Sequence, residues 1–330
     1  MIITRTPFRV SFIGGGSDLP DFYSQHPGAV LSTTINKYMY ISSHRFFEPD
    51  KIRVKYSKTE TVGDVNELQH PILREVFKQF GIAGGLEVSS IADVPSGTGL
   101  GSSSSFTVGL LHNLNIIRNK FITKDYLAQE ACRVEIDLLK EPIGKQDQYA
   151  AAFGGLNVFQ FKSSGEVHVE PLHQLTEVIK QLEKNLLMFY TGDQRSASNI
   201  LSEQKKNIQE SKKLESLKKM VELVDEAKKV IFSGQLDEFG KILHENWLLK
   251  KGLASGISNS SINQAYDAAL KAGALGGKLL GAGGGGFLLF YCPGHTQAKV
   301  IEALKSLRKF DFKFEQEGSK LIHYSDEMSM

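Results

Sequence analysis

The sequence predicts an α+β protein of two domains, and three observations indicate this. The chain has 330 residues, which corresponds to about two domains at roughly 150 residues each. Its first 60 residues are rich in the β-branched and aromatic residues that strands favour. Residues 196–251 instead form a long, charged pattern with helical spacing. We therefore expect a β-rich domain over residues 1–180 and a helix-rich domain over residues 181–330.

The first half of the chain is expected to contain most of the strands. Five of them lie near its beginning, at Ile2–Thr6, Phe8–Ile13, Ala29–Ile35, Tyr38–Arg45 and Lys51–Tyr56. The elements expected next are helix Asn66–Phe80, strand Gly85–Ile91, helix Phe106–Ile117 and helix Thr123–Leu139. Thr123 suits the start of the last helix, because its hydroxyl can accept a hydrogen bond from a free backbone N–H.

The second half is expected to be richer in helices. A strand should end at Phe161, after a break at Gly154–Gly155. The later elements are strand Leu186–Tyr190, helices within Ser196–Lys251, helix Ser260–Ala272, strand Phe287–Cys292, helix His295–Leu307 and strand Phe310–Phe314. The lysine- and glutamate-rich run Gln204–Lys219 is typical of a solvated helix face.

The composition excludes several classes of protein. Lysine and arginine total 39 and aspartate and glutamate total 37, so the formal net charge is +2. This near balance argues against a nucleic-acid partner. There is no apolar stretch of 18 residues and no signal-peptide pattern, so we expect neither a membrane span nor secretion. Two cysteines, Cys132 and Cys292, are too few for a disulfide framework and fit buried thiols in a cytoplasmic protein.

The segment PSGTGLGSSSS, residues 95–105, lies between a predicted strand and a predicted helix. Glycines let consecutive backbone N–H groups approach an anion, and the start of a helix adds the positive end of its dipole. Serine hydroxyls add further ligands, so the segment predicts a phosphate-binding loop rather than a plain flexible turn. The residues concerned are Pro95, Ser96, Gly97, Thr98, Gly99, Leu100, Gly101, Ser102, Ser103 and Ser104.

Two common nucleotide-binding motifs fit poorly. The P-loop pattern GxxxxGK[ST] is missed by one residue at Gly273–Lys278, where Leu279 also replaces the hydroxyl residue. The dinucleotide pattern GxGxxG is only partly met, because Ser102 occupies the third glycine position after Gly97 and Gly99. A nicotinamide-dependent oxidoreductase is therefore disfavoured. The nine histidines show no metal-ligand spacing.

Three glycine-rich segments together resemble the signatures of the GHMP kinases, which include galactokinase, homoserine kinase and mevalonate kinase. They are TPFR (6–9) with IGGGSD (13–18), PSGTGLGSSSS (95–105), and KLL with GAGGGG (278–286). The resemblance spans essentially the whole chain. It implies a small-molecule kinase that uses ATP and Mg²⁺. It also implies an N-terminal domain like the second domain of ribosomal protein S5 and a ferredoxin-like C-terminal domain.

Within this family, three longer segments most resemble the sugar-1-kinases that act on D-glycero-D-manno-heptose 7-phosphate. The segments are RTPFRVSFIGGGSDLPDFY (5–23), GKQDQYAAAFGGLN (144–157) and TGDQRSASNIL (191–201). The resemblance implies phosphorylation of the anomeric C1 hydroxyl of that sugar phosphate, in the synthesis of nucleotide-activated heptose. The alternatives are another sugar-1-kinase, such as an L-fucose kinase, and a non-catalytic sugar sensor on the same fold.

The resemblance also implies roles for individual residues. Asp147, within GKQDQY, is the candidate base for the acceptor hydroxyl. Arg9 is the candidate for stabilising both Asp147 and the transferred phosphoryl group. Ser103 and Glu135 are the candidate Mg²⁺ ligands, because both present hard oxygen atoms. Ser102 competes with Ser103 for this role, and Glu130 competes with Glu135.

A further set of residues is expected on the acceptor side, namely Gly15, Gly16, Ser17, Asp18, Arg195, Gly283 and Gly284. Asp18 matches the aspartate that holds sugar hydroxyls in galactokinase-like members, whereas Gly15 and Gly16 replace a Glu-His pair common there. Arg195 is expected to grip the phosphate of a sugar phosphate, with Lys145 as the second candidate. The expected partner is a small-molecule sugar phosphate, and the sequence leaves formation of a homodimer open.

Overall fold

The computed structural model describes all residues except 173–175, 193–196, 208–209 and 326–330. The larger of its two sheets has nine strands in the described residues. They are β1 (Ile2–Ile13), β2 (Gly28–Arg45), β3 (Ile52–Lys55), β4 (Thr59–Val62), β5 (Leu86–Ala92), β6 (Asn157–Phe161), β7 (Val167–Pro171), β12 (Phe314–Glu315) and β13 (Lys320–Tyr324). The main order is β13-β1-β2-β5-β3-β4, and β6 and β12 also pair with β2. Only β3 and β5 pair in parallel within this described sheet.

The smaller sheet has four antiparallel strands in the order β11-β8-β10-β9. They are β8 (Leu186–Tyr190), β9 (Gly276–Leu279), β10 (Phe287–Tyr291) and β11 (Arg308–Lys309). Strand β10 lies between β8 and β9, and every one of its residues is buried. Its uninterrupted apolar pattern therefore reflects packing on both faces.

The described residues form eleven α-helices and two short helices of other types. The α-helices are α1 (Pro20–Tyr23), α2 (Pro71–Gln79), α3 (Ser102–Ile117), α4 (Lys124–Cys132), α5 (Gln146–Phe153), α6 (Thr176–Lys184), α7 (Ala197–Asn207), α8 (Ser211–Ser233), α9 (Leu236–Lys251), α10 (Ser260–Lys271) and α11 (Gln297–Ala303). A 3₁₀-helix spans Val65–Glu67, and a π-helix spans Arg133–Leu138.

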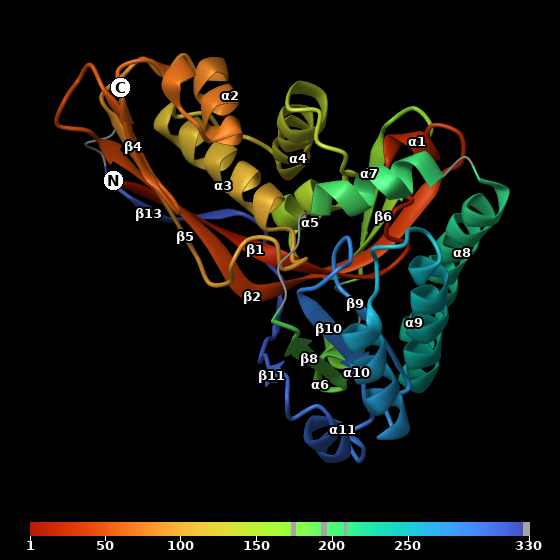
Figure 1. Ribbon diagram of the computed structural model, residues 1–330. Helices are drawn as coiled ribbons and strands as arrows, with labels where there is room; N and C mark the ends of the chain where they lie inside the picture. The colour runs from red at the N-terminus through yellow and green to blue at the C-terminus, as the bar shows by residue number, and fades with distance from the viewer. Residues whose placement is uncertain (173–175, 193–196, 208–209, 326–330) are drawn as a thin grey trace.

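The two sheets face different sets of helices. Figure 1 shows α2, α3, α4 and α5 on one side of the larger sheet, and the smaller sheet with α6, α10 and α11 on the other. Helix α9 contacts β1 of the larger sheet and both β9 and β10 of the smaller one. It therefore joins the two sheets, and its buried Trp247 belongs to the apolar cluster around the smaller sheet.

Strand β1 lies inside the larger sheet and positions the first candidate residues. Phe8, Val10 and Phe12 are fully buried on one face of the strand. Side chains alternate along a strand, so Arg9 and Ser11 lie on the other face. Each of these two residues is only 5% exposed. Arg9 is therefore not a solvated surface arginine.

Two segments predicted as single helices are interrupted. In Asn66–Phe80, α2 begins only at Pro71, whose ring removes a backbone N–H that the first turn of a helix does not need. The segment Thr123–Leu139 changes from α-helix to π-helix, although its N-cap is the expected one. The N–H of Tyr126 donates to the Thr123 hydroxyl at 3.1 Å.

The long helical segment 196–251 contains three helices in its described residues, α7, α8 and α9. Gly234, with φ of 73°, ends α8 in the left-handed conformation that glycine adopts most readily. The prediction of a solvated face over Gln204–Lys219 is wrong at its first residue, because Gln204 is 2% exposed. Leu217, in the same run, is fully buried.

The last described strands return to the first sheet. Strand β13 pairs with β1, and β12 pairs with β2. The division into two domains at residue 180 stays a prediction. Because β12 and β13 return to the larger sheet, a single boundary does not assign every segment to one of two domains. Strands β4, β7 and β13 and helices α1 and α6 were not predicted. No helix in the described residues is long and apolar enough to cross a membrane.

Candidate active site

The glycine- and serine-rich loop leads directly into α3. The helix starts at Ser102, four residues before the predicted start, so the serines form its first turn. Gly97, Gly99 and Gly101 have φ of 74°, 84° and 77°, a backbone conformation that suits glycine. The first N–H groups of a helix lack partners within the helix. The loop and the positive end of the α3 dipole together form a suitable phosphate site.

The loop 281–286 packs against the phosphate loop. A β-carbon on Gly281 would collide with Gly99, and one on Gly99 would lie 2.5 Å from the carbonyl oxygen of Leu280. Gly286 similarly lies against the carbonyl of Thr98. Two glycine-rich segments far apart in sequence are thus in direct backbone contact.

Gly283 and Gly284, expected on the acceptor side, contact a third segment. A β-carbon on Gly283 would lie 2.6 Å from the Cα of Ile257, and the N–H of Gly284 donates to the carbonyl of Ile257 at 3.0 Å. These contacts hold the middle of the loop 281–286 in place.

Arg9 and Asp147 form a two-pronged ion pair beside the phosphate loop. Nε and Nη2 of Arg9 each donate to one carboxylate oxygen of Asp147 at 2.7 Å, and Nη1 donates to the carbonyl of Gly99 at 2.6 Å. A β-carbon on Gly101 would lie 3.2 Å from Arg9 Cγ and 3.3 Å from Asp147 Oδ2. The loop, the guanidinium and the carboxylate therefore meet at one point, and the ion pair fixes the orientation of the carboxylate.

Glu135 lies on the π-helix and is fully buried. Its Oε1 accepts a hydrogen bond from Ser103 Oγ at 2.6 Å, and its Oε2 accepts one from Gln148 Nε2 at 2.7 Å. Burial raises the pKa of the Glu135 carboxyl to about 7, while the bonds from Ser103, Gln148 and Ser104 oppose that rise. Among the described residues this carboxylate has no cationic partner, and a metal ion can supply one.

The structure distinguishes the two alternative metal ligands, Glu130 and Ser102, from Glu135 and Ser103. Glu130 forms an ion pair with Arg133 at 3.0 Å and accepts from Gln79. Ser103 is the serine whose hydroxyl donates to Glu135, at 2.6 Å. No group of three or more His, Cys, Asp or Glu residues in the described chain could hold a metal by itself. One carboxylate and one hydroxyl nevertheless suit Mg²⁺, which takes its other ligands from water and phosphate.

Asp18 connects the first glycine-rich turn to the segment before Asp147. Its Oδ1 accepts from the N–H of Gly16 at 2.9 Å, and its Oδ2 accepts from the N–H of Gln146 at 3.3 Å. Burial raises the pKa of Asp18, the bonds from the backbone lower it, and nearby Asp147 adds to the rise. Ser17 has its hydroxyl engaged by the backbone of Gly14 and Ala29, so it shapes the turn.

Three polar side chains that the sequence did not single out converge on the same turn. Ser11 Oγ, Gln146 Oε1 and Gln204 Nε2 are buried and have no hydrogen-bond partner among the residues that the structure describes. A β-carbon on Gly15 would lie 3.5 Å from Ser11 Oγ and 3.6 Å from Gln146 Nε2, and one on Gly16 would collide with Gln204 Nε2. Buried polar atoms are normally bonded, so a polar ligand is the simplest partner for this cluster.

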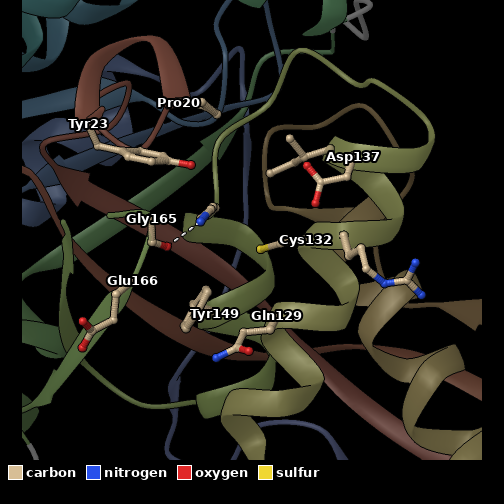
Figure 2. A pocket seen from close by; sticks show the side chains of 11 residues that line it. Pro20, Tyr23, Gln129, Cys132, Asp137, Tyr149, Gly165 and Glu166 are labelled. Carbon is tan, nitrogen blue, oxygen red and sulfur yellow. Dashed lines mark hydrogen bonds between the residues drawn. The ribbon is translucent and has the colours of Figure 1, made fainter. Parts of the chain in front are cut away.

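Of the two cations proposed for a sugar phosphate, only Lys145 is described by the structure. Arg195 lies outside the described residues. Lys145 turns away from Asp147: its Nζ donates to the carbonyl of Gly165 at 2.6 Å and lies 5.0 Å from the centre of the Tyr23 ring. Lys145 lines a cavity of about 480 Å³ between α1, α4, the start of α5 and the turn before β7. Figure 2 shows Tyr23, Cys132, Tyr149 and Gly165 around this cavity. Lys145 therefore contributes its backbone N–H, which donates to Asp18 at 3.3 Å, rather than its charge.

Comparison with known proteins decides the family. Models of the GHMP kinases N terminal domain and the GHMP kinases C terminal region match residues 67–155 and 220–309. A D-glycero-alpha-D-manno-heptose 7-phosphate kinase from Campylobacter jejuni is 30% identical, over 97% of this chain and 98% of that protein. The chain belongs to the GHMP kinase family. As a GHMP kinase it is an ATP-dependent phosphotransferase, and the predicted α+β architecture of that family is confirmed.

Two further relatives of this GHMP kinase are a heptose phosphate kinase and a fucokinase. The crystal structure of a D-glycero-D-manno-heptose 1-phosphate kinase from Bacteroides thetaiotaomicron has a TM-score of 0.80 at 23% identity, and covers 99% of this chain and 100% of that one. An L-fucokinase/L-fucose-1-P guanylyltransferase from Bacteroides fragilis is 27% identical over 92% of this chain and 35% of that protein. The chain is therefore a sugar kinase with the GHMP kinase fold. These relatives differ in the sugar that their names give.

Proposed function

We propose that the protein transfers the γ-phosphoryl group of ATP to the anomeric C1 hydroxyl of D-glycero-D-manno-heptose 7-phosphate, giving the 1,7-bisphosphate. The observation that supports this most is the position of Asp147, held by Arg9 between the phosphate loop and the unpaired polar cluster. The similarity to the Campylobacter jejuni kinase favours this sugar. The reaction would supply nucleotide-activated heptose synthesis in the cytoplasm.

Asp147 is the proposed base. Its carboxylate accepts the proton of the C1 hydroxyl while the hydroxyl oxygen forms a bond to the γ-phosphorus, and the bond to the ADP oxygen breaks. Arg9 orients both oxygens of Asp147 through its two hydrogen bonds to the carboxylate. Positioning of this kind supplies much of the catalysis in phosphoryl transfer, because the transition state is loose.

Glu135 and Ser103 are the proposed ligands of Mg²⁺, since a buried carboxylate without a cation lies against a hydroxyl. The ion, when bound, neutralises charge on the phosphate oxygens. Gln148 holds the second oxygen of Glu135 and so fixes the orientation of the carboxylate.

The acceptor side offers neutral hydrogen-bonding groups that suit sugar hydroxyls. Ser11, Gln146 and Gln204 present an unpaired hydroxyl, an unpaired amide oxygen and an unpaired amide N–H. The absence of a side chain at Gly16 lets Gln204 approach this turn, because a β-carbon there would collide with Gln204 Nε2. We place the hydroxyl-bearing ring of the sugar against this cluster and assign its distant phosphate to Arg195.

An L-fucose kinase is the second candidate, because bifunctional fucokinases are similar over more than nine tenths of this chain. L-Fucose carries no phosphate, so its kinase needs no cation at the far end of the sugar. Replacement of Arg195 by Ala separates the two proposals. A phosphorylated acceptor should lose affinity roughly 10- to 100-fold, whereas an unphosphorylated acceptor should lose almost none.

The deciding experiment measures ADP release from Mg-ATP with five acceptors: D-glycero-D-manno-heptose 7-phosphate, unphosphorylated heptose, mannose, L-fucose and galactose. We expect turnover of the heptose phosphate, with phosphorus NMR placing the new phosphate on C1. Asp147→Asn should lower kcat about 10²- to 10⁴-fold, and Asp125→Asn on exposed α4 is the matched control. Efficient turnover of L-fucose alone would overturn the proposed substrate.

A further inference from the structure

Lys250 is a buried lysine in the last turn of α9, and the mechanism above gives it no role. The residue is 5% exposed, and its Nζ donates a hydrogen bond to the carbonyl of Gly281. An ammonium group has three N–H donors, so this single bond leaves two of them unused. A charge in such surroundings normally has a partner of opposite sign, because burial removes its hydration.

No salt bridge to Lys250 occurs within the part of the chain that the structure describes. Asp18 and Asp147 are close enough to favour its charged form electrostatically, but each carboxylate is bonded elsewhere. Burial and the charge of Arg9 outweigh them and lower the pKa of Lys250 to about 8. The ammonium therefore lacks an anionic partner while it lies beside the candidate site.

The position of Lys250 relates it to the phosphate loop. Gly281, whose carbonyl it binds, lies directly against Gly99. The carbonyl of Gly99 in turn accepts from Arg9 Nη1 at 2.6 Å. Arg9 and Lys250 thus bind the carbonyls of two glycines that touch each other across the two loops. Because Arg9 also binds Asp147, the phosphate loop, the candidate base and Lys250 all lie around this junction.

Arg9 was expected to stabilise both Asp147 and the transferred phosphoryl group. In the structure, the edge formed by its Nε and Nη2 is taken by Asp147, and Nη1 is bonded to Gly99. Its positive charge is therefore balanced by that carboxylate. Phosphoryl transfer needs a cation that faces the equatorial oxygens as their charge redistributes.

We propose that Lys250 is this cation: its ammonium donates hydrogen bonds to the non-bridging oxygens of the phosphoryl group during transfer from ATP to the acceptor. Lys250 keeps its proton throughout, so the bond changes and the proton transfer to Asp147 are those given above. The inference rests on the proposed phosphoryl-transfer site but not on which sugar is the acceptor.

The charged groups that act on Lys250 come from four elements. They are Arg9 on β1, Asp18 in the turn after β1, Asp147 on α5 and Lys278 on β9. Lys278 is itself buried, donates to the carbonyl of Phe12 at 2.7 Å, and has its pKa lowered well below the usual value by burial. Lys278 thus helps to hold β1 against β9, and Lys250 supplies the charge at the junction.

The test compares Lys250→Met and Lys250→Arg with Lys251→Met. Lys251 is the matched control, because it is the adjacent cation but lies over the Trp247 ring, at 5.8 Å. We expect Lys250→Met to lower kcat about 10²- to 10³-fold, as removal of one preorganised donor does, with little change in KM for ATP. Lys250→Arg should restore part of the rate, and Lys251→Met should resemble the wild type. A kcat of Lys250→Met within about threefold of wild type would overturn the proposal.

A pH profile separates this role from a structural one. The ammonium is lost as pH rises through the pKa of Lys250, so kcat/KM of the wild type should fall above about pH 8. In Lys250→Arg this fall should move to higher pH, because arginine stays protonated. An unchanged alkaline limb in Lys250→Arg would contradict the inference even if the rate falls.

Folding and substrate identity are controlled separately. Lys250→Met removes a buried charge, so its melting temperature should not fall, and a folded but inactive protein supports the catalytic role. If the wild type phosphorylates none of the sugars tested, the proposed substrate is wrong. The role of Lys250 is then tested by the rate of slow ATP hydrolysis without a sugar, because this reaction transfers the same phosphoryl group to water. Loss of that hydrolysis in Lys250→Met supports the proposal, and equal rates overturn it.

Discussion

Gly281 and Gly99 are in backbone contact, and neither position has room for a side chain. Gly99 belongs to the phosphate loop after β5, whereas Gly281 follows β9 of the smaller sheet. The contact therefore makes the shape of the phosphate loop depend on the second half of the chain. This relationship explains why glycine-rich segments so far apart in sequence act as one site.

Gly281→Ala should weaken ATP binding. The residue has φ of 71°, and a β-carbon there would displace Gly99, so the phosphate loop must shift. A strained residue of this kind costs about 1–3 kcal/mol, and we expect KM for ATP to rise roughly tenfold with a lower melting temperature. Gly294→Ala is the control, since nothing lies within 4 Å of its β-carbon position. Equal effects of the two substitutions would show that the contact does not shape the loop.

Arg9→Lys should lower kcat at least about tenfold, although it keeps the charge. A lysine cannot donate to both oxygens of Asp147 and to Gly99 from one planar group. Nucleotide binding, followed by calorimetry, should change much less than kcat. Arg5→Lys is the control on the same strand, because Arg5 reaches Glu315 through a single 3.4 Å contact. A kcat equal to that of the wild type would mean that the fork does not orient the base.

Gln204 on α7 provides a test of the acceptor side. Gln204→Leu should raise KM for the sugar about tenfold while KM for ATP stays unchanged, because it removes a hydrogen-bond donor from the cluster beside Gly16. Its melting temperature should stay equal or rise, since an unpaired buried amide is also removed. Lys205→Met, which removes a surface ion pair with Asp21 from the same helix, is the control. A lower melting temperature with no change in KM would assign Gln204 a structural role only.

Glu135 makes the stability of the ligand-free protein depend on pH. Its pKa is 4.5 in a model compound and about 7 in the folded chain, so between these values the folded state binds more protons than the unfolded state. This contribution to stability is therefore lost as pH rises from about 4.5 to 7. Glu135→Gln should remove the loss, measured by urea unfolding without divalent ions at several pH values.

Glu130→Gln is the control for that measurement, because Glu130 forms a half-exposed pair with Arg133. It should follow the wild-type pH dependence. Addition of Mg-ATP should stabilise the wild type at pH 8 more than Glu135→Gln, since only the wild type offers an anionic ligand. Identical curves for the wild type and Glu135→Gln would remove Glu135 from the proposed metal site.

The parts of the fold that were predicted correctly are those with a strong local pattern. The alternation over Phe8–Ile13 and the apolar run of β10 are such local patterns. The separate strands predicted at Ile2–Thr6 and Phe8–Ile13 are one strand, β1, whose pairing with β2 is irregular at Pro7. The exact start of α2 depended on Pro71, and the start of α3 on serines that looked like loop residues. Short strands such as β12 and β13 have no such pattern, because pairing with distant strands stabilises them.

Some residues of the candidate site could likewise be named from the sequence, and others could not. Asp147, Arg9, Ser103 and Glu135 were named from segments that resemble a family, and the structure brings them into two bonded pairs. Gln204 and Lys250 were missed, because each lies in a helix whose charged pattern indicates a solvated surface. Only the packing of α7 and α9 against the glycine turns shows that their polar ends are buried. Burial of a single polar residue in an otherwise polar helix leaves no signal in one sequence.

Strand β1 carries Arg9, and one of its edges is covered by β13, with Ile2 opposite Tyr324. A ribosome therefore delivers β1 long before it delivers the strand that covers it. Until then the N–H and C=O groups along that edge can pair with any other extended chain, including a second nascent copy. The edge of β1 therefore stays open until residues 320–324 have been synthesised and β13 has paired with it.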